Sequence, residues 1–207
     1  MKKINVEYIK RAIQDIKKLD FDLRYLGKRA TPDIVGFYGE LLVWKELKSR
    51  FGWQGYKISI GQGQTRADIK MEKKGTPLNI EVKTSRLKKE WFGEGYGLAI
   101  NIKRCKSHKG IIFEHPRKGK IEGDFCYFDY LIAVLLSDDL KKKEFYIFPK
   151  SFFIDNEKEL RNRNKRFSSA THRLVFIKNE NQSEEITEFD RNLAKNRNKY
   201  KNWEIIL

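Results

Sequence analysis

The stretch RADIKMEKKGTPLNIEVKTS, residues 66–85, decides the fold because apolar and polar side chains alternate on each side of a turn near Gly75 and Pro77. Such alternation is typical of half-buried strands, and two such runs around a turn form a β-hairpin. The apolar positions are Ala67, Ile69 and Met71, then Leu78, Ile80 and Val82. The opposite positions carry Asp68, Glu81 and Lys83. The sequence therefore predicts a hairpin with one core-facing side and one charged side.

The register of this hairpin brings its charges together. A four-residue loop places Glu72 opposite Pro77 and, further along the same ladder, Asp68 opposite Glu81. Directly opposite residues share a face, with Cβ atoms roughly 5 Å apart, and Lys83 points to the same face as Glu81. Two carboxylates at that spacing repel each other unless a cation lies between them. Mg²⁺ is commonly held by one or two carboxylates plus water and phosphate. The alternative is an exposed charged face with ordinary salt bridges.

A third carboxylate is predicted to face the same sheet. Thr31 can cap a helix that has Pro32 at its first position and runs to about residue 50. Within it, the neighbours of Glu40 at three and four positions on either side are non-polar: Gly36, Phe37, Val43 and Trp44. A carboxylate in that setting is costly unless it finds a partner. We therefore expect Glu40 to point inward, toward the sheet with Asp68. The alternative is a partly exposed position at the edge of the apolar stripe.

Further helices and strands are predicted around the hairpin. Apolar residues at helical spacing predict a helix over residues 4–19, and residues 57–60 read as a strand just before the hairpin. An almost continuous apolar run at residues 125–136 predicts a central strand covered on both faces. Residues 144–149 are its expected neighbour. This order predicts an α/β fold in which helices flank a mixed central sheet.

The rest of the chain is harder to assign. Short strands are predicted at residues 98–102 and 173–178, and residues 103–123 read as a long basic loop. No internal repeat and no clear linker divides the sequence. We therefore expect a single domain over residues 1–207.

The composition indicates a polyanionic partner. Lys and Arg number 44 against 28 Asp and Glu, which gives a formal net charge of +16 in 207 residues. A balance that basic favours nucleic acid, the alternative being a lysine-rich protein from an AT-rich or thermophilic genome. No apolar leader or membrane-length run is present, and two cysteines fit a reducing compartment. We therefore expect a cytoplasmic protein without membrane attachment.

The charged residues together resemble the motif of the PD-(D/E)XK nuclease superfamily, which has the restriction-endonuclease-like fold. Glu40 matches the glutamate of the first core helix, and Asp68 matches the aspartate of the second core strand. Glu81-Val82-Lys83 matches the E-x-K of the third core strand. The chain departs from the pattern in having Ala67 rather than proline before the aspartate, a departure that is frequent in the family and costs little.

The resemblance covers about residues 31–150, because the runs at residues 125–136 and 144–149 resemble the remaining core strands. It implies one nuclease domain over residues 1–207, with residues 151–207 as a basic C-terminal extension.

The resemblance implies Mg²⁺-dependent hydrolysis of phosphodiester bonds, with Mn²⁺ as a substitute metal. Asp68 and Glu81 would hold the metal, helped by the main-chain carbonyl of Val82. Lys83 would orient the attacking water and offset the charge that develops on the phosphate. Glu40 would complete the outer shell or bind a second metal ion. Whether one or two metals act stays open.

Within the superfamily, the chain is expected to be a type II restriction endonuclease, a sequence-specific enzyme, because a basic insertion and about 60 residues after the core supply extra elements. A Holliday junction resolvase or a DNA repair nuclease of the same fold is the alternative. A nucleic-acid-binding protein that does not cleave is a third hypothesis, although Asp68, Glu81 and Lys83 together argue against it.

The first two hypotheses imply double-stranded DNA as substrate and a homodimer, since two cuts need two sites. A restriction enzyme further implies a cognate DNA methyltransferase encoded nearby.

Contacts with DNA are expected from two basic segments, one in the insertion and one in the extension. They contain Lys103, Arg104, Lys106, Lys109, Arg117, Lys118 and Lys120, then Arg161, Arg163, Lys165 and Arg166. Phosphate contacts give affinity without sequence choice, so no recognition sequence is predicted.

A zinc site is an open alternative use of the insertion. Cys105, His108, His115 and Cys126 fall within 22 residues, but their spacing is irregular and lacks a C-x-x-C. Cys126 also lies in an apolar run, where cysteine is usually a small core residue.

Overall fold

The structure is a computed structural model that describes residues 6–26, 31–60, 67–87, 100–103, 112–115, 119–122, 128–156, 159–160, 171–174 and 187–206. For Leu87 and for the segments 100–103, 112–115, 119–122 and 171–174, the description is limited to the backbone. Among the helices in these ranges, none combines the length and the apolar character needed to cross a bilayer.

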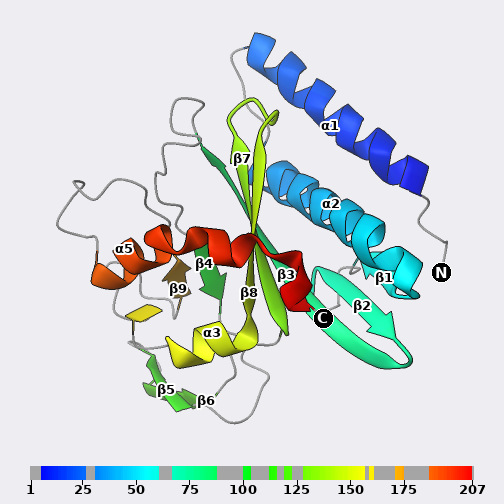
Figure 1. The fold of residues 1–207 in the computed structure, drawn as a ribbon. Helices are drawn as coiled ribbons and strands as arrows, with labels where there is room; N and C mark the ends of the chain where they lie inside the picture. Colours follow the sequence, from blue (N-terminus) through cyan, green and yellow to red (C-terminus); the bar gives the residue numbers. More distant parts are fainter. Residues whose placement is uncertain are drawn as a thin grey trace.

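A five-stranded mixed sheet forms the centre of the fold, with helices on both of its faces (Figure 1). In spatial order its strands are β1 (Lys57–Ile60), β2 (Ile69–Lys73), β3 (Thr76–Leu87), β7 (Tyr130–Ser137) and β8 (Lys143–Pro149). β3 and β7 are parallel, and the other neighbouring strands of this sheet are antiparallel. The predicted α/β architecture, a mixed sheet flanked by helices, is therefore confirmed.

The hairpin β2–β3 has the predicted register but a tighter turn. Glu72 pairs with Pro77, as expected, and the ladder continues to Ile69 opposite Ile80. Lys73 also pairs with Thr76, so the loop has two residues rather than four. Those two, Lys74 and Gly75, have φ values of 51° and 83°. Two successive positive φ values match the right-handed twist of the flanking strands, and the predicted four-residue loop was therefore wrong.

Strand β7 is buried along nearly its whole length, as its apolar sequence predicts, but it begins at Tyr130 rather than at residue 125. Its start is fixed against β3 by Asp129. The Asn79 N–H donates to the Asp129 carboxylate over 2.7 Å, and the Asp129 N–H donates to the Asn79 carbonyl over 2.8 Å. The first parallel pair, Ile80 with Tyr130, follows directly. β8 lies beside β7, as predicted.

Helix α2 (Pro32–Phe51) covers one face of the sheet (Figure 1). It starts as predicted, with the Thr31 Oγ1 accepting the Ile34 N–H at 3.5 Å. Its buried side chains join the inward residues of the strands in one apolar cluster, which includes Leu41, Trp44, Leu47, Ile69, Ile80, Val82 and Ile132. The apolar positions of the hairpin therefore face α2, and its charged positions face the other side of the sheet.

Helix α1 (Val6–Tyr25) lies against the outer side of α2 (Figure 1). It is longer than the predicted helix over residues 4–19, and Ile9 and Ile13 of its predicted stripe are buried in the same apolar cluster.

The second face of the sheet is covered by the C-terminal part of the chain. The elements on this face are α3 (Lys150–Asp155), α5 (Glu188–Lys195) and the 3₁₀ segment η3 (Arg197–Lys201), whereas the last 3₁₀ segment, η4 (Trp203–Ile206), packs in the cluster on the α2 side. Tyr200 packs on Phe148 with ring centroids 4.6 Å apart, and Trp203 packs on Phe145 at 5.4 Å. Because Phe145 and Phe148 point to opposite faces of β8, the tail crosses the outer edge of that strand.

The region predicted as a basic loop contains a second hairpin. β5 (Ile112–His115) and β6 (Gly119–Glu122) pair as antiparallel strands, so the prediction of a loop over residues 103–123 was wrong there. β4 (Ile100–Lys103) and β9 (Thr171–Leu174) also pair, and they overlap the predicted short strands. Periodicity is weak in such four-residue strands, because basic residues interrupt it. A short 3₁₀ turn, η1 (Gly52–Gln54), follows α2.

A network of ion pairs ties α1 to the end of β3 and to the β7–β8 turn. Arg86 of β3 contacts the carboxylate of Asp20, and its Nε donates to the Asp138 carbonyl oxygen over 2.7 Å. Arg24 pairs with Asp20 at 2.8 Å and with the Asp138 carboxylate at 2.9 Å. The side chain of Asp20 is only 3% exposed, so these arginines replace the water that it loses.

We expect the Asp20→Asn substitution to destabilise the fold by about 3 kcal/mol near neutral pH, because it leaves two guanidinium groups without their shared carboxylate. Burial alone would raise the pKa of Asp20, but hydrogen bonds from Arg86 and Arg24 hold it below its ordinary value of 3.8. A carboxyl with a lowered pKa contributes stability above 3.8 and loses it as the pH falls further. Urea unfolding should therefore show the two proteins converging in acid.

The matched control is Asp15→Asn, an exposed position on the same helix. Equal stability of Asp20→Asn and wild type at pH 7 would contradict the role given to the network.

Candidate active site

The predicted acidic residues meet where the β2–β3 ladder ends. Asp68 lies one residue before β2, and its Oδ2 accepts the backbone N–H of Val82 over 2.7 Å. This bond continues the connection between the two strands beyond their last ladder pair, Ile69 with Ile80. It fixes Asp68 beside β3 and leaves the second carboxylate oxygen of Asp68 for another partner.

Glu81 and Lys83 project from β3 on the same side as Asp68. Glu81 is only 3% exposed, and the Lys83 ammonium contacts its Oε1. The Lys83 side chain keeps 32% of its surface exposed, so a buried carboxylate is paired with an ammonium group that solvent can reach. A buried carboxylate needs such a partner, since an isolated charge would be strongly destabilising there.

Glu40 of α2 lies close enough to these groups to be affected by their charges. Its side chain is half-buried, and its pKa is raised from 4.5 to about 7. Desolvation is the largest cause, the negative charges of Asp68 and Glu81 add to it, and Lys83 acts in the opposite direction. The structure thus brings all four charged residues of the predicted site within electrostatic reach of one another. Near neutral pH, Glu40 exchanges its proton readily.

The position of Glu40 depends on the glycine before it. A Cβ on Gly39 would lie 1.8 Å from the Oγ1 of Thr84, so α2 rests directly on the Thr84 side chain of β3 at this point. The sequence alone did not predict this contact. The available signal was a glycine in the middle of an otherwise apolar helix, which often marks a close approach.

Most of the other predicted site residues lie outside the described residues. The structure gives only the backbone of Lys103, Lys120 and His115. Outside the described ranges lie Arg104, Lys106, Lys109, Arg117, Lys118, Arg161, Arg163, Lys165 and Arg166, and also Cys105, His108 and Cys126. The predictions of DNA contacts and of a zinc alternative are therefore not tested there.

The carboxylates suit a hard cation such as Mg²⁺. Among the side chains that are described, no three from His, Cys, Asp and Glu gather into a complete metal cluster. Mg²⁺ does not need one, because it often takes one or two carboxylates and fills its octahedron with water and phosphate. Asp68 and Glu81 supply the two carboxylates that such a site needs, and one oxygen of Asp68 is already held by a backbone N–H.

Comparison with known proteins gives a structural similarity but no match by sequence. No protein-family model matches the sequence, and no curated protein matches it. Among solved structures, the chain is similar to a bacterial homing endonuclease, I-Ssp6803I, with 15% sequence identity and a TM-score of 0.38. The similarity extends over 84% of this chain and 99% of that one. At that identity and score it carries no argument about what this chain does.

We expect Gly39→Ala to destabilise the fold by about 1–3 kcal/mol, since the added methyl group must push α2 away from β3. Gly36→Ala is the matched control on the same helix, because its Cβ would meet nothing within 4 Å. That change should stabilise the protein by about 0.5–1 kcal/mol through helix propensity. Thermal unfolding of both variants measures the difference, and equal effects would contradict the close contact.

We expect Glu40→Gln to gain stability relative to wild type as the pH rises. The raised pKa means that the carboxyl group of Glu40 stabilises the fold below pH 4.5 and loses this contribution as the pH passes about 7. Gln cannot ionise, so the difference in melting temperature between variant and wild type should be larger at pH 8 than at pH 5. Measurements in EDTA, with exposed Glu72→Gln as control, test this. A difference that does not change with pH would contradict the placement of Glu40.

Proposed function

We propose that this protein is a Mg²⁺-dependent DNA endonuclease, and that its role is that of a type II restriction enzyme. The observation that carries the proposal is the pairing of the buried Glu81 with Lys83 on one strand, with Asp68 fixed beside them and Glu40 within electrostatic reach. Ordinary surface salt bridges do not bury a carboxylate to 3% exposure next to two further acids.

Each residue of the site has a distinct proposed role. Asp68 and Glu81 would hold the metal ion, with the Val82 carbonyl as a further oxygen donor. When bound, Mg²⁺ polarises the phosphoryl oxygen and lowers the pKa of its water. Lys83 would position the attacking water and stabilise the charge that develops on the phosphate.

Glu40 would act at the outer edge of the site. Because its pKa is about 7, it can accept a proton from water or return one near neutral pH. It would not need to contact the phosphate for this role.

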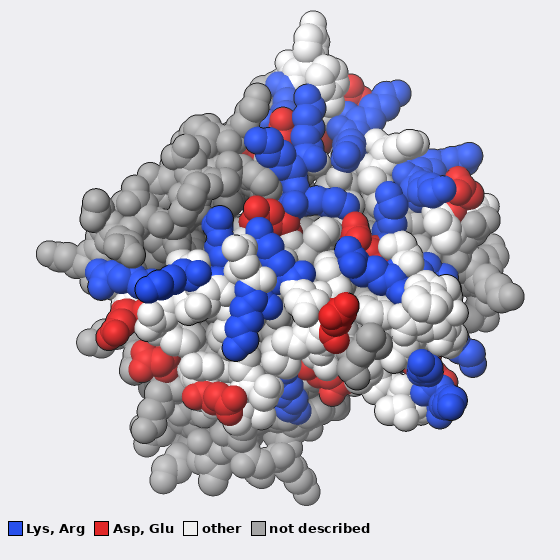
Figure 2. Space-filling model, in the orientation of Figure 1, with Lys and Arg blue, Asp and Glu red and all other residues white. Residues whose placement is uncertain are grey.

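Double-stranded DNA is the proposed substrate because the protein is strongly basic overall while its site is acidic. The net charge of +16 favours a polyanion in general, and Figure 2 shows Lys and Arg side chains distributed widely over the face that it presents. One copy of the site attacks one strand at a time, so a homodimer on DNA is part of the proposal.

The test is cleavage of plasmid and genomic DNA by the purified protein in Mg²⁺ and in EDTA. Discrete fragments in Mg²⁺ alone are expected. Glu81→Gln and Lys83→Ala should each lower the rate at least about 100-fold, because the first removes a charged metal ligand and the second removes charge stabilisation at the reacting phosphate. The matched control is Glu72→Gln, an exposed glutamate on the same hairpin, which should cleave at the wild-type rate.

Two outcomes would contradict the proposal in different ways. Cleavage of four-way junctions without cleavage of linear duplexes would replace the restriction role with that of a resolvase. An intact fold with no Mg²⁺-dependent cleavage of any DNA, or normal cleavage by Glu81→Gln, would overturn the assignment of the site.

A further inference from the structure

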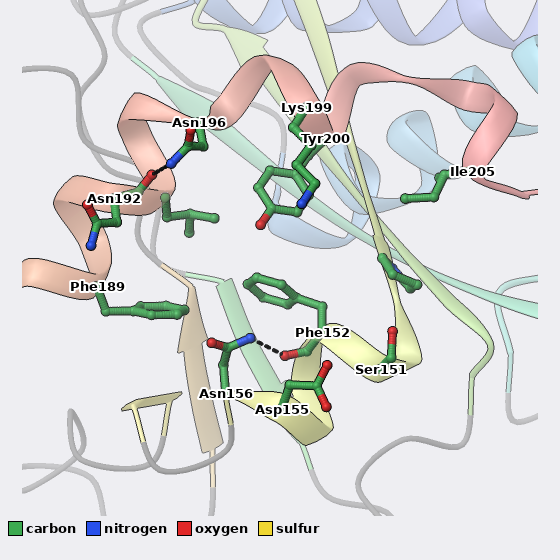
Figure 3. A pocket seen from close by; sticks show the side chains of 12 residues that line it. Ser151, Phe152, Asp155, Asn156, Phe189, Asn192, Asn196, Lys199, Tyr200 and Ile205 are labelled. Atoms are coloured by element: carbon green, nitrogen blue, oxygen red, sulfur yellow. Dashed lines mark hydrogen bonds between the residues drawn. The ribbon is translucent and has the colours of Figure 1, made fainter.

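A concave site separate from the acidic residues lies on the same face of the sheet as Glu81, between α3 and the segment formed by α5 and η3 (Figure 3). Its volume is about 530 Å³, within the range of about 300–1,000 Å³ that is usual for small-ligand pockets. The lining combines three aromatic rings with several polar side chains, and none of these residues belongs to the acidic site.

The aromatic part consists of Phe152, Phe189 and Tyr200, whose rings point toward the space between the two helical segments (Figure 3). The ring centroids of Phe152 and Phe189 are 6.2 Å apart, and those of Phe152 and Tyr200 are 5.5 Å apart. Phe152 is fixed from below by Phe148, at 4.9 Å. These rings form a firm apolar surface that can receive a flat ligand.

The polar part consists of three carboxamides and one ammonium group. Asn156 and Asn196 use their side-chain N–H groups internally, donating to the carbonyl oxygens of Phe152 and Asn192 over 2.7 and 2.9 Å. Their amide oxygens remain on the lining side chains as acceptors. Lys199 is exposed at the rim, and no carboxylate among the described side chains forms an ion pair with it. Asp155 lies on the opposite wall, so an anionic group would bind on the Lys199 side.

The strand register relates this pocket to the acidic site. Glu81 pairs with Leu131 across β3 and β7, and Leu131 pairs with Phe148 across β7 and β8. Paired residues share a face, and neighbouring strands lie about 4.8 Å apart, so Phe148 stands about 10 Å from Glu81 in one row. Tyr200 and Phe152 pack on Phe148. The aromatic pocket therefore begins about two strand spacings from Glu81.

We propose that this pocket binds one unstacked base of the DNA strand that the acidic site attacks. The aromatic rings would stack on the base, the asparagine amides would hydrogen-bond to its edge, and Lys199 would contact its phosphate. A purely apolar ligand would leave the amides and the ammonium group without partners. The inference rests on the proposed function, since DNA is the source of the base, but binding of a base does not require cleavage.

The first test measures binding of the four deoxynucleoside 5′-monophosphates in EDTA, with deoxyribose 5-phosphate as the probe without a base. The blocking variant is Asn192→Trp, at an exposed pocket position of α5. The matched control is Asn198→Trp, an exposed asparagine in η3 that does not line the pocket. We expect at least one mononucleotide to bind about tenfold or more tightly than the sugar phosphate. Asn192→Trp should lose this binding, and Asn198→Trp should keep it.

The second test removes one stacking surface. Phe189→Ala should weaken binding of the mononucleotide by roughly 5- to 150-fold, the range for one stacked base. Lys199→Ala should weaken it less, with Lys45→Ala, an exposed lysine on α2, as the matched loss of charge. A single-stranded DNA decamer should displace the mononucleotide from the wild-type protein.

Several results would overturn the inference. These are equal affinity for mononucleotide and sugar phosphate, equal loss in both Trp variants, or failure of the decamer to compete. Lys83→Ala separates the two proposals, because it should abolish cleavage while pocket-dependent binding persists. If no DNA is cleaved by wild type but Asn192→Trp still selectively loses mononucleotide, the proposed nuclease function fails and the pocket assignment stands.

Discussion

The contact between Gly39 and Thr84 is the constraint on which the arrangement of this protein depends. With no side chain on Gly39, α2 lies directly against β3, and the next residue of the helix, Glu40, reaches the charges of Asp68 and Glu81. A helix held one methyl group further away would move Glu40 outward, and the sheet would have only the two carboxylates of the hairpin. The close packing costs the buried Thr84 Oγ1 its hydrogen bond, the one such unsatisfied side-chain atom found among the described residues.

Strand β3 carries nearly every interaction that matters for the site. It pairs with β2 on one side and runs parallel to β7 on the other, and its own sequence includes Glu81, Lys83, Thr84 and Arg86. Near its far end, Arg86 is held by Asp20 and Asp138, while near its start Asn79 is held by Asp129. Since both ends are fixed, the carboxylate and ammonium groups between them are positioned by rigid backbone, as precise chemistry requires.

The electrostatics of the site work against the stability of the fold. Three carboxylates within electrostatic reach of one another, one of them buried to 3% exposure, repel one another; Lys83 reduces the repulsion, and the raised pKa of Glu40 reflects it. A cation placed among them would reduce it further. Clusters of this kind are concentrated where chemistry needs shifted pKa values, which is why the proposed function is argued from the burial of these charges rather than from their number.

The C-terminal segment both covers the edge of the sheet and forms part of the aromatic pocket. By crossing the edge of β8, it places Tyr200 over Phe148 and Trp203 over Phe145, and so covers a strand edge that would otherwise be open to pairing with another chain. The same segment forms one wall of the aromatic pocket opposite α3. One piece of chain thus protects the sheet and, in our proposal, receives a base beside the acidic site.

The sequence by itself determined the elements whose signals are local. Alternation set the hairpin and its pairing of Glu72 with Pro77, Thr31 and Pro32 set the start of α2, and a continuous apolar run set the buried strand β7. It also singled out Glu40, Asp68, Glu81 and Lys83, because charges at core-facing or paired positions are visible in one dimension. The two-residue turn was not predicted because loop length depends on whether Lys74 adopts a positive φ, and a lysine side chain gives no sign of that conformation.

Only the tertiary structure decided the Gly39–Thr84 contact, the network around Asp20, and the row from Glu81 to Phe148 that leads to the pocket. Each of these joins residues distant in the chain, and their meeting depends on how helices and strands pack rather than on any pattern within one segment.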